Sequence, residues 1–254
     1  MLIPQIKYSS DTSTQQLVQS IKHWSLFGQV AIIGIDATAV DDVKSILRQV
    51  GGTVDISIEF ESSDAAEQLA MLNEGACRLL NRDSSQDSET VPSDRQINLI
   101  ENTPLDQAIP QSTLVALDSP TTSRIAELEM ARIDCLVDIE HLSPELITDY
   151  FKTVLVTDRP DGLWSTVIVD PIGVARGLAY SNYESLLHAI ETRCGTYWSR
   201  SRDGLWIKGE TSGATQQLLG IRMDCDRDCL RFTVTQDSPG FCHRNTHTCF
   251  GQER

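Results

Sequence analysis

Apolar runs of strand length alternate with amphipathic stretches of helical period over most of the first 140 residues. The run QVAIIGID (29–36) precedes AVDDVKSILRQVG, in which apolar residues recur at the spacing of one helix face. TVDISIEF (53–60) and SDAAEQLAMLNEGA repeat this order, and STLVALD and CLVDIE bracket the helical stretch SRIAELEMARI. Strands that alternate with helices favour an α/β domain, a βα-repeat with a largely parallel sheet. This half contains no glycine-rich phosphate loop, nucleophile elbow or metal-ligand spacing, so we expect a scaffold or unknown role for it.

The pattern changes between residues 143 and 162. SPELITDYF predicts a last helix capped by Ser143, and NYESLLHAIETR predicts one later helix capped by Asn182. Short strands with turn residues between them are predicted for LWSTVIVD, VARGLAYS, GTYWS, LWIKG, LLGIRMD and CLRFTVTQ. We therefore expect two domains: an α/β domain over residues 1–150 and a β-rich α+β domain over residues 151–254.

Charge and composition exclude several classes of partner. The formal net charge is −15, so nucleic-acid phosphates and anionic membrane surfaces would repel the chain, and neither is expected as a partner. The beginning, MLIPQIKYSSDTST, has no basic segment followed by an apolar core, and no run of about 18 apolar residues occurs anywhere. We therefore expect a soluble, cytoplasmic protein.

Seven cysteines in a reducing compartment are not expected to form a disulfide framework. Cys77, Cys135 and Cys194 stand singly and are predicted to be buried apolar groups. The other four lie close together, between residues 225 and 249. This second group points to metal chemistry.

The segment RMDCDRDC alternates acid and thiol: Asp224, Cys225, Asp226, Asp228 and Cys229. On a strand, the three carboxylates would share one face and the two thiols the other. Three carboxylates form a hard oxygen site suited to Mg²⁺, whereas a thiolate is a soft ligand suited to Zn²⁺. A solvated acidic turn remains an alternative.

A calcium loop of the EF-hand type, and with it a Ca²⁺ sensor, does not fit this segment. The sixth position holds Cys229 where that loop requires glycine, and the twelfth holds Thr235 where it requires glutamate.

The segment GFCHRNTHTCF adds further metal ligands: Cys242, His243, His247 and Cys249. Three thiolates around Zn²⁺ would leave one position open for a water, which becomes hydroxide near neutral pH. A closed structural zinc clamp with a histidine as fourth ligand is the alternative, and the spacing leaves both open.

A basic and aromatic cluster lies in TYWSRSRDGLWIKGETSG, within an otherwise acidic chain. Arginine forks and a lysine suit phosphate, tryptophan faces suit a purine base, and two glycines let backbone N–H groups approach an oxyanion. The alternative is a hairpin with ordinary cross-strand pairs. The predicted substrate-binding residues are Trp198, Ser199, Arg200, Arg202, Trp206, Lys208, Glu210, Thr211 and Ser212.

Together, YWSRSRDGLWIKGETSG, RMDCDRDCLRF and GFCHRNTHTCFG resemble the phosphoribosyl-AMP cyclohydrolases of histidine biosynthesis, over about residues 158–251. TDRPDGLWSTVIVD and the first half resemble the fungal version. There the cyclohydrolase is the N-terminal part of a trifunctional protein that also carries phosphoribosyl-ATP pyrophosphohydrolase and histidinol dehydrogenase. We interpret the chain as an N-terminal portion of such a protein, and a monofunctional protein is the alternative. The resemblance implies hydrolysis of the N1–C6 bond of the purine ring of phosphoribosyl-AMP, which gives the ring-opened phosphoribosylformimino carboxamide ribotide.

The resemblance also implies roles for individual residues. Cys225, Cys242 and Cys249 would bind Zn²⁺, with Cys225 supplied by the partner subunit of a homodimer. The three aspartates would bind Mg²⁺, and His243 would orient or deprotonate the attacking water. His247 is expected to be solvent-exposed. Cys229 stands where the family has a small residue, and we expect it to pack and not to bind metal.

A non-enzymatic module, in which zinc only holds a binding or regulatory fold together, is the competing interpretation. It predicts that chelation unfolds the domain and that His243→Ala changes neither stability nor activity.

Overall fold

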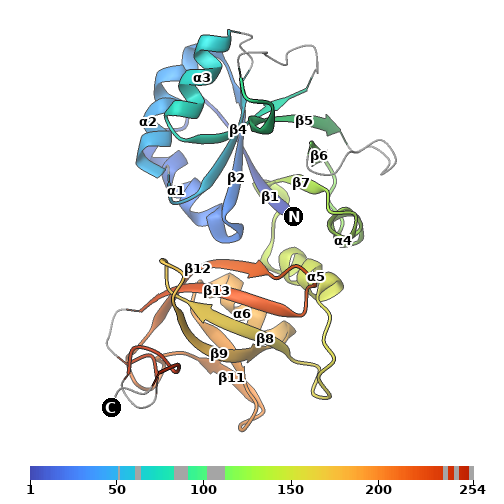
Figure 1. The fold of residues 1–254 in the computed structure, drawn as a ribbon, viewed down its shortest axis with the longest axis vertical. Coiled ribbons are helices and arrows are strands. Elements are labelled where there is room, and N and C mark those ends of the chain that lie inside the picture. Colours follow the sequence, from blue (N-terminus) through green and yellow to red (C-terminus); the bar gives the residue numbers. More distant parts are fainter. Residues whose placement is uncertain are drawn as a thin grey trace. The chain divides into compact units, whose positions relative to one another are not determined.

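The computed structural model describes residues 1–50, 52–60, 64–82, 91–101, 112–236, 240–242 and 246–251. They form two compact units, Met1–Leu142 and Ser143–Arg254 (Figure 1). The division falls between residues 142 and 143, whereas the sequence suggested a boundary at 150. The reason is that helix α5 (Pro144–Val154), capped by Ser143, packs against α6 (Tyr183–Thr192) of the second unit. No helix among these residues is long and apolar enough to cross a bilayer.

The strands of the first unit are β1 (Leu2–Lys7), β2 (Gln29–Ile35), β3 (Asp55–Phe60), β4 (Ala76–Asn81), β5 (Gln96–Glu101), β6 (Thr113–Leu117) and β7 (Asp134–Asp138). Each pairs in parallel with the next, and β7 pairs with β1, so the sheet closes into a barrel. The expected parallel α/β character is confirmed, whereas the closure of the sheet into a barrel was not predicted. Closure depends on β1, whose Pro4 lacks a backbone N–H and so masks the strand in the sequence.

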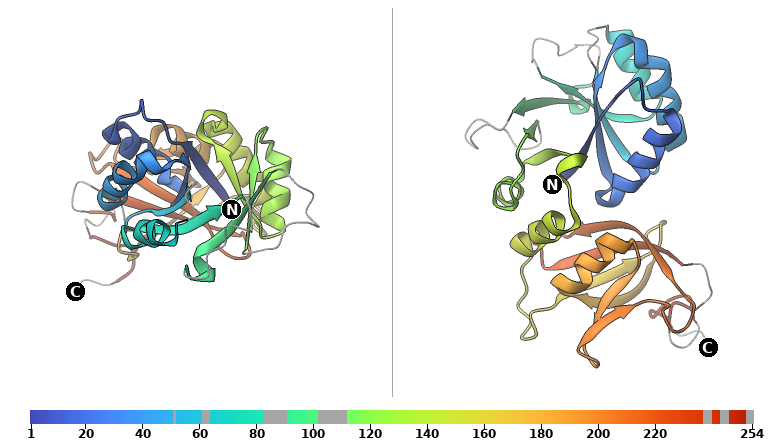
Figure 2. Two further views of the ribbon diagram at one scale, coloured as in Figure 1. Left: turned by 90° about the horizontal axis from the view of Figure 1, so that it is seen from above. Right: turned by 180° about the vertical axis from the view of Figure 1, so that it is seen from behind.

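Four helices accompany the described strands of this unit: α1 (Thr14–Trp24), α2 (Val40–Val50), α3 (Ala65–Asn73) and α4 (Thr122–Met130). α1, α2 and α3 lie along one side of the barrel (Figures 1 and 2). Side chains alternate along each strand, so the barrel has two apolar layers. Ile32 and Ile56 belong to the buried cluster that includes the helices, whereas Ile3, Ala31 and Leu136 belong to a separate cluster.

The second unit contains α5, β8 (Trp164–Val169), β9 (Ala175–Ser181), α6, β10 (Thr196–Ser199), β11 (Gly204–Ile207), β12 (Gln216–Met223) and β13 (Cys229–Gln236). All six runs predicted as strands are strands, and α6 begins after Asn182 with a capping box, as predicted. Four of them form a sheet in the order β12-β13-β8-β9, in which only the β13–β8 pairing is parallel. β10 and β11 form a separate hairpin.

The two faces of the four-stranded sheet differ. One face carries the core of the unit, where Phe232 is fully buried and its ring centroid lies 5.8 Å from that of Tyr197. The other face carries residues of the opposite register, among them Val167, Leu178 and Arg231, which are half-buried or exposed. Figure 2 shows α6 over the sheet in the view from behind. The unit therefore presents one open sheet face with apolar side chains on it.

Candidate metal and substrate site

The segment RMDCDRDC forms a turn between β12 and β13, so the expectation that strand alternation separates acids from thiols is wrong. β12 ends at Met223 and β13 begins at Cys229. The carboxylate Oδ1 of Asp224 accepts the N–H groups of Asp228 and Cys229, each at 3.1 Å. Arg227 adopts a left-handed conformation with φ of 65°, which completes the reversal. The turn brings the acids together by a different route from the one expected.

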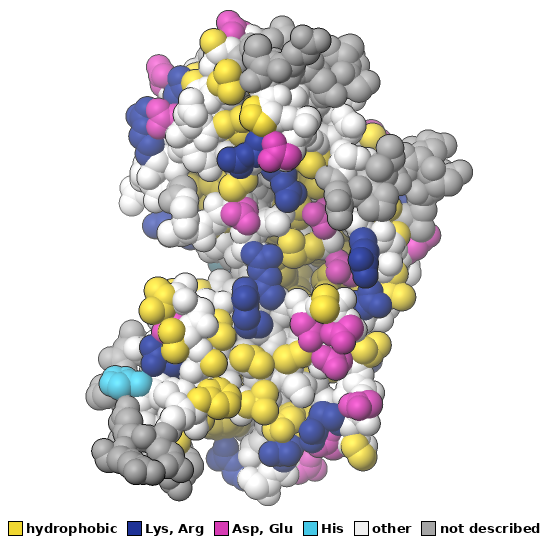
Figure 3. Space-filling view, viewed as in Figure 1, with side chains coloured by type: hydrophobic (Ala, Val, Ile, Leu, Met, Phe, Trp, Pro, Cys, Tyr) yellow, Lys and Arg dark blue, Asp and Glu magenta, His cyan; other side chains and the backbone are white. Residues whose placement is uncertain are grey.

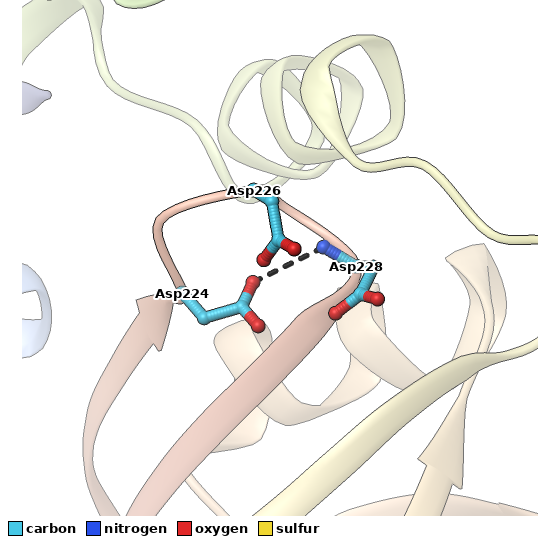
Figure 4. A group of neighbouring side chains, drawn as sticks. All are labelled: Asp224, Asp226 and Asp228. Carbon is cyan, nitrogen blue, oxygen red and sulfur yellow. Dashed lines mark hydrogen bonds between the residues drawn. The ribbon is translucent and has the colours of Figure 1, made fainter.

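Ligand oxygens of the three aspartates lie within 4.8 Å of one another, and all three side chains are exposed (Figure 4). The hydrogen bond with Asp224, together with the negative charges of Asp226 and Asp224, raises the pKa of the Asp228 carboxyl group. Mutual repulsion of this kind is relieved by a cation. The donor set, three carboxylates free of sulfur and nitrogen, fits Mg²⁺.

A second constellation pairs the thiols of Cys242 and Cys249. Cys242 is buried, and its side chain hydrogen-bonds with that of Cys249. Partial burial raises the pKa of Cys249, as does its neighbour thiol, while Lys208 opposes this. The ammonium group of Lys208 donates to the Phe241 carbonyl at 2.8 Å, and its own pKa is lowered by burial. Two soft ligands and one cation therefore converge here.

Cys225 is not part of this pair. It lies in the aspartate turn, beside the start of β13 at Cys229, and it is exposed. The backbone N–H of Cys249 donates to the carbonyl of Arg176 in β9 at 2.8 Å. The neighbouring residue Ala175 pairs with Val169 of β8, which in turn pairs with Thr233 of β13. Four residues of β13, or about 13 Å, separate Cys229 from Thr233. One copy of the chain thus assembles two of the three expected zinc ligands.

The two histidines of this segment differ in what the structure describes. His243, the expected catalytic residue, lies outside the described residues. His247 is exposed, as expected, and its carbonyl accepts a hydrogen bond from Arg176 at 3.2 Å.

Gly177 of β9 allows the thiol segment to approach the sheet. A Cβ atom at Gly177 would lie 2.4 Å from the Phe241 ring and 3.4 Å from the Cys249 sulfur. A cavity of about 400 Å³ adjoins this contact, and its lining includes Phe241, Asp170 and Arg176. Arg176 and Asp170 form an ion pair at 2.6 Å. Gly177, Asp170 and Arg176 were not predicted as site residues, because their role depends on contacts between distant segments.

The predicted tryptophan pair does not converge. In the β10–β11 hairpin Tyr197 lies opposite Trp206, and Trp198 lies opposite Leu205. Directly opposed residues share a face and neighbours along a strand do not, so the two tryptophans lie on opposite faces. Lys208 lies 5.9 Å from the Trp206 ring centroid, which places Trp206 on the side of the thiols.

The predicted arginines lie at the tip of the hairpin. The Arg200 guanidinium stacks on the ring of Tyr180, a β9 residue that the sequence did not single out, at 4.0 Å from the centroid. Arg159 contacts the same ring at 4.4 Å. The Arg202 Nε donates to Ser199 Oγ at 3.2 Å. The Tyr180 ring therefore contacts two guanidinium groups, one of which belongs to the predicted phosphate-binding residue Arg200.

The segment after β11 turns at the two glycines that were expected to let backbone N–H groups approach an oxyanion. Gly209 and Gly213 have φ angles of 89° and 74°, and Glu210, Thr211 and Ser212 between them are exposed. A Cβ atom on Gly209 would lie 2.3 Å from the backbone nitrogen of Thr215. Only glycine fits this position.

Gly209→Ala is expected to destabilise the second unit by about 2 kcal/mol or more, because left-handed strain and a backbone clash act together. Gly213→Ala is the matched control: its φ is also positive, but nothing lies within 4 Å of its Cβ position. It should cost only about 1 kcal/mol. Urea unfolding of both variants measures the difference, and equal losses would contradict the backbone-contact argument.

The sequence of the chain matches one protein family over the residues of this site. The family model for phosphoribosyl-AMP cyclohydrolase matches residues 177–251. The chain is 42% identical over 111 residues to a phosphoribosyl-AMP cyclohydrolase of Cereibacter sphaeroides, which covers 41% of this chain and 92% of that protein. It is 35% identical over 230 residues to a histidine biosynthesis trifunctional protein of Saccharomyces cerevisiae, covering 90% of this chain. A Kluyveromyces lactis protein of the same description is 34% identical over 231 residues.

The chain spans 27% of the length of each of these two yeast relatives. The bacterial relative, in contrast, is matched over nearly its whole length. The thiol pair, Lys208 and the aspartate turn all lie within the stretch that the family model matches. On these grounds the chain belongs to the phosphoribosyl-AMP cyclohydrolase family.

Proposed function

We propose that the second unit hydrolyses the N1–C6 bond of the purine ring of phosphoribosyl-AMP and yields the ring-opened carboxamide ribotide of histidine biosynthesis. The observation that carries the proposal is the Cys242–Cys249 thiol pair beside Lys208, within the residues that match the family. The direct test measures the absorbance change of ring opening with purified protein, together with its metal content. Absence of turnover with zinc and magnesium supplied would overturn the proposal.

Zinc is the metal that suits the thiol pair, because two thiolates are soft donors. When bound, Zn²⁺ would supply a Lewis acid that makes a water molecule acidic near neutral pH. Two basic side chains hold the segment that carries the thiols. Lys208 donates a hydrogen bond to the Phe241 carbonyl, and Arg176 donates one to the His247 carbonyl. His243 is our candidate for orienting the attacking water or removing its proton.

A homodimer completes the zinc site in this proposal. Cys225 lies in the turn before β13. It is too far from the thiol pair of its own copy to join it, so a second copy would supply it. The open sheet face supports a second copy as the occupant, because Leu178 there is 52% exposed. Figure 3 shows hydrophobic side chains among charged ones over the second unit. Burial of such a face against an identical one is typical of twofold dimers.

Magnesium is proposed for the aspartate turn, and Asp226→Asn tests it best. Asp224 also holds the turn by accepting two N–H groups, whereas no hydrogen bond of the Asp226 carboxylate takes part in it. We expect the Mg²⁺ concentration for half-maximal turnover to rise about 10-fold or more in this variant. The control is Asp158→Asn, a nearby exposed carboxylate outside the trio. An unchanged Mg²⁺ requirement in Asp226→Asn would contradict the proposed magnesium site.

Tyr180 is proposed to position the arginines that hold substrate phosphate. Each cation–ring contact contributes about 0.5–1 kcal/mol at an exposed site. Tyr180→Leu is therefore expected to raise the KM for phosphoribosyl-AMP about 3- to 10-fold with kcat unchanged, and Tyr180→Phe should restore it. Tyr183→Leu is the matched control, since its ring contacts only Lys152 among the described cations. A fall in kcat without a change in KM would contradict the positioning role.

The competing module, in which zinc only holds the fold, makes a different prediction. Chelation would unfold the second unit, and no preparation would turn over substrate. The cyclohydrolase proposal predicts turnover that chelation abolishes and that added Zn²⁺ restores.

A further inference from the structure

The first unit contains a polar cavity that the proposed reaction does not use. Its volume is about 500 Å³, within the range of small-molecule sites. It lies where strands begin: Gln29 and Asp55 are the first residues of β2 and β3, and Arg95 directly precedes β5. We call it the amino-end pocket. Enzymes built on barrels of parallel strands usually have their active sites at the carboxyl ends of the strands. The fold alone therefore does not explain a pocket at the amino ends.

Strand register explains why polar groups share this pocket. Gln29 lies opposite Asp55 across β2 and β3, and Ser57 lies opposite Arg78 across β3 and β4. Registered side chains of neighbouring strands point to the same side of a sheet, so these four project together. Ser57 is 4% exposed and also lies opposite Ala31 of the inner apolar cluster. Its hydroxyl therefore belongs to the deep part of the pocket.

The charges of the pocket are balanced but incompletely paired. Arg95 donates to the Cys77 carbonyl at 2.7 Å, and the Cys77 thiol donates to Asp55 at 3.5 Å. The side chain of Arg78 is half-buried and makes no hydrogen bond or ion pair with any residue in the described part of the chain. Asp94 is the second carboxylate in the lining. A half-buried guanidinium without a partner favours a ligand carboxylate, with which it forms a two-point contact.

We propose that the amino-end pocket binds a free α-amino acid. The two carboxylates make a phosphate or dicarboxylate unfavourable, because like charges would face each other in a partly enclosed site. A zwitterion satisfies both signs: its carboxylate pairs with Arg78, and its ammonium group pairs with Asp55. The buried hydroxyl of Ser57 and the amide of Gln29 offer polar contacts beside these two. The proposal is independent of the reaction in the second unit.

Isothermal titration calorimetry of the full chain against each of the twenty common amino acids tests this. We expect at least one to bind with a Kd below about 10 mM. Its amide and its N-acetyl derivative should not bind, because each lacks one of the two charges. Inorganic phosphate should not bind either. No binding by any amino acid, or equally tight binding of the amide, would overturn the proposal.

Variants locate the site. Arg78→Gln is expected to raise the Kd for the amino acid at least 10-fold. Asp55→Asn provides a second test should Arg78→Gln fold poorly. Arg124→Gln is the control, since this arginine lies on α4 and pairs with Glu127. Thermal unfolding of each variant checks that the unit is folded. Unchanged affinity in a folded Arg78→Gln or Asp55→Asn protein would overturn the assignment to this pocket.

Discussion

Cys242→Ser and Cys249→Ser should each lower phosphoribosyl-AMP turnover by roughly 100-fold or more and reduce bound zinc. Removal even of a residue that supports a metal ligand costs 10–100-fold, so loss of a ligand itself should cost at least as much. Cys194→Ser is the control: among the described residues, this half-buried thiol of the second unit donates a hydrogen bond only to the carbonyl of Thr192. Turnover and zinc content at the wild-type level in both variants would end the zinc proposal.

Mixed dimers separate a shared zinc site from one contained in a single copy. Cys225→Ser and Cys249→Ser chains are each expected to be inactive alone, whereas a mixed dimer would retain one complete set of thiols. Co-refolding equal amounts should restore about a quarter of wild-type turnover, because half the dimers are mixed and each has one intact site of two. If all three thiols came from one copy, mixing would restore nothing.

Phe232→Ala should destabilise the second unit by about 3–5 kcal/mol, a large part of the stability of a domain of this size. Phe232 is 0% exposed on the core face of β13 and lies against Tyr197. Its loss leaves a cavity that neighbouring strands cannot close. Urea unfolding of the second unit, followed by tryptophan fluorescence, measures the change.

Phe250→Ala is the matched substitution, since Phe250 is 52% exposed. It should change the free energy of unfolding by less than about 0.5 kcal/mol. A similar loss in both variants would show that burial at Phe232 is not the source of the effect.

Local features were predictable from the sequence. The α6 cap at Asn182 and the six strands of the second unit follow from spacing and residue type, and each is present. The three aspartates do come together, but in a turn and not on one face of a strand. Cys135 is buried as predicted, but Cys77 and Cys194 are only half-buried.

Features that depend on long-range pairing were not predictable. Closure of the barrel requires β1 to pair with β7, more than 130 residues away in the sequence. β1 was not predicted as a strand, because it contains Pro4. The opposite faces of Trp198 and Trp206 follow from hairpin register, which residue types alone do not set. The contact of Tyr180 with Arg159 and Arg200 likewise joins three separate segments.

The piece of chain that carries Cys249 also covers a strand edge. β9 is the outermost strand of its sheet, and its carbonyls at Ala175 and Arg176 accept hydrogen bonds from Thr248 and Cys249. Unpaired edges recruit strands from other molecules. A change that releases this segment is therefore also expected to make the protein prone to aggregation, which light scattering would detect. If zinc binds as proposed, its retention and the colloidal stability of the protein would depend on the same few hydrogen bonds.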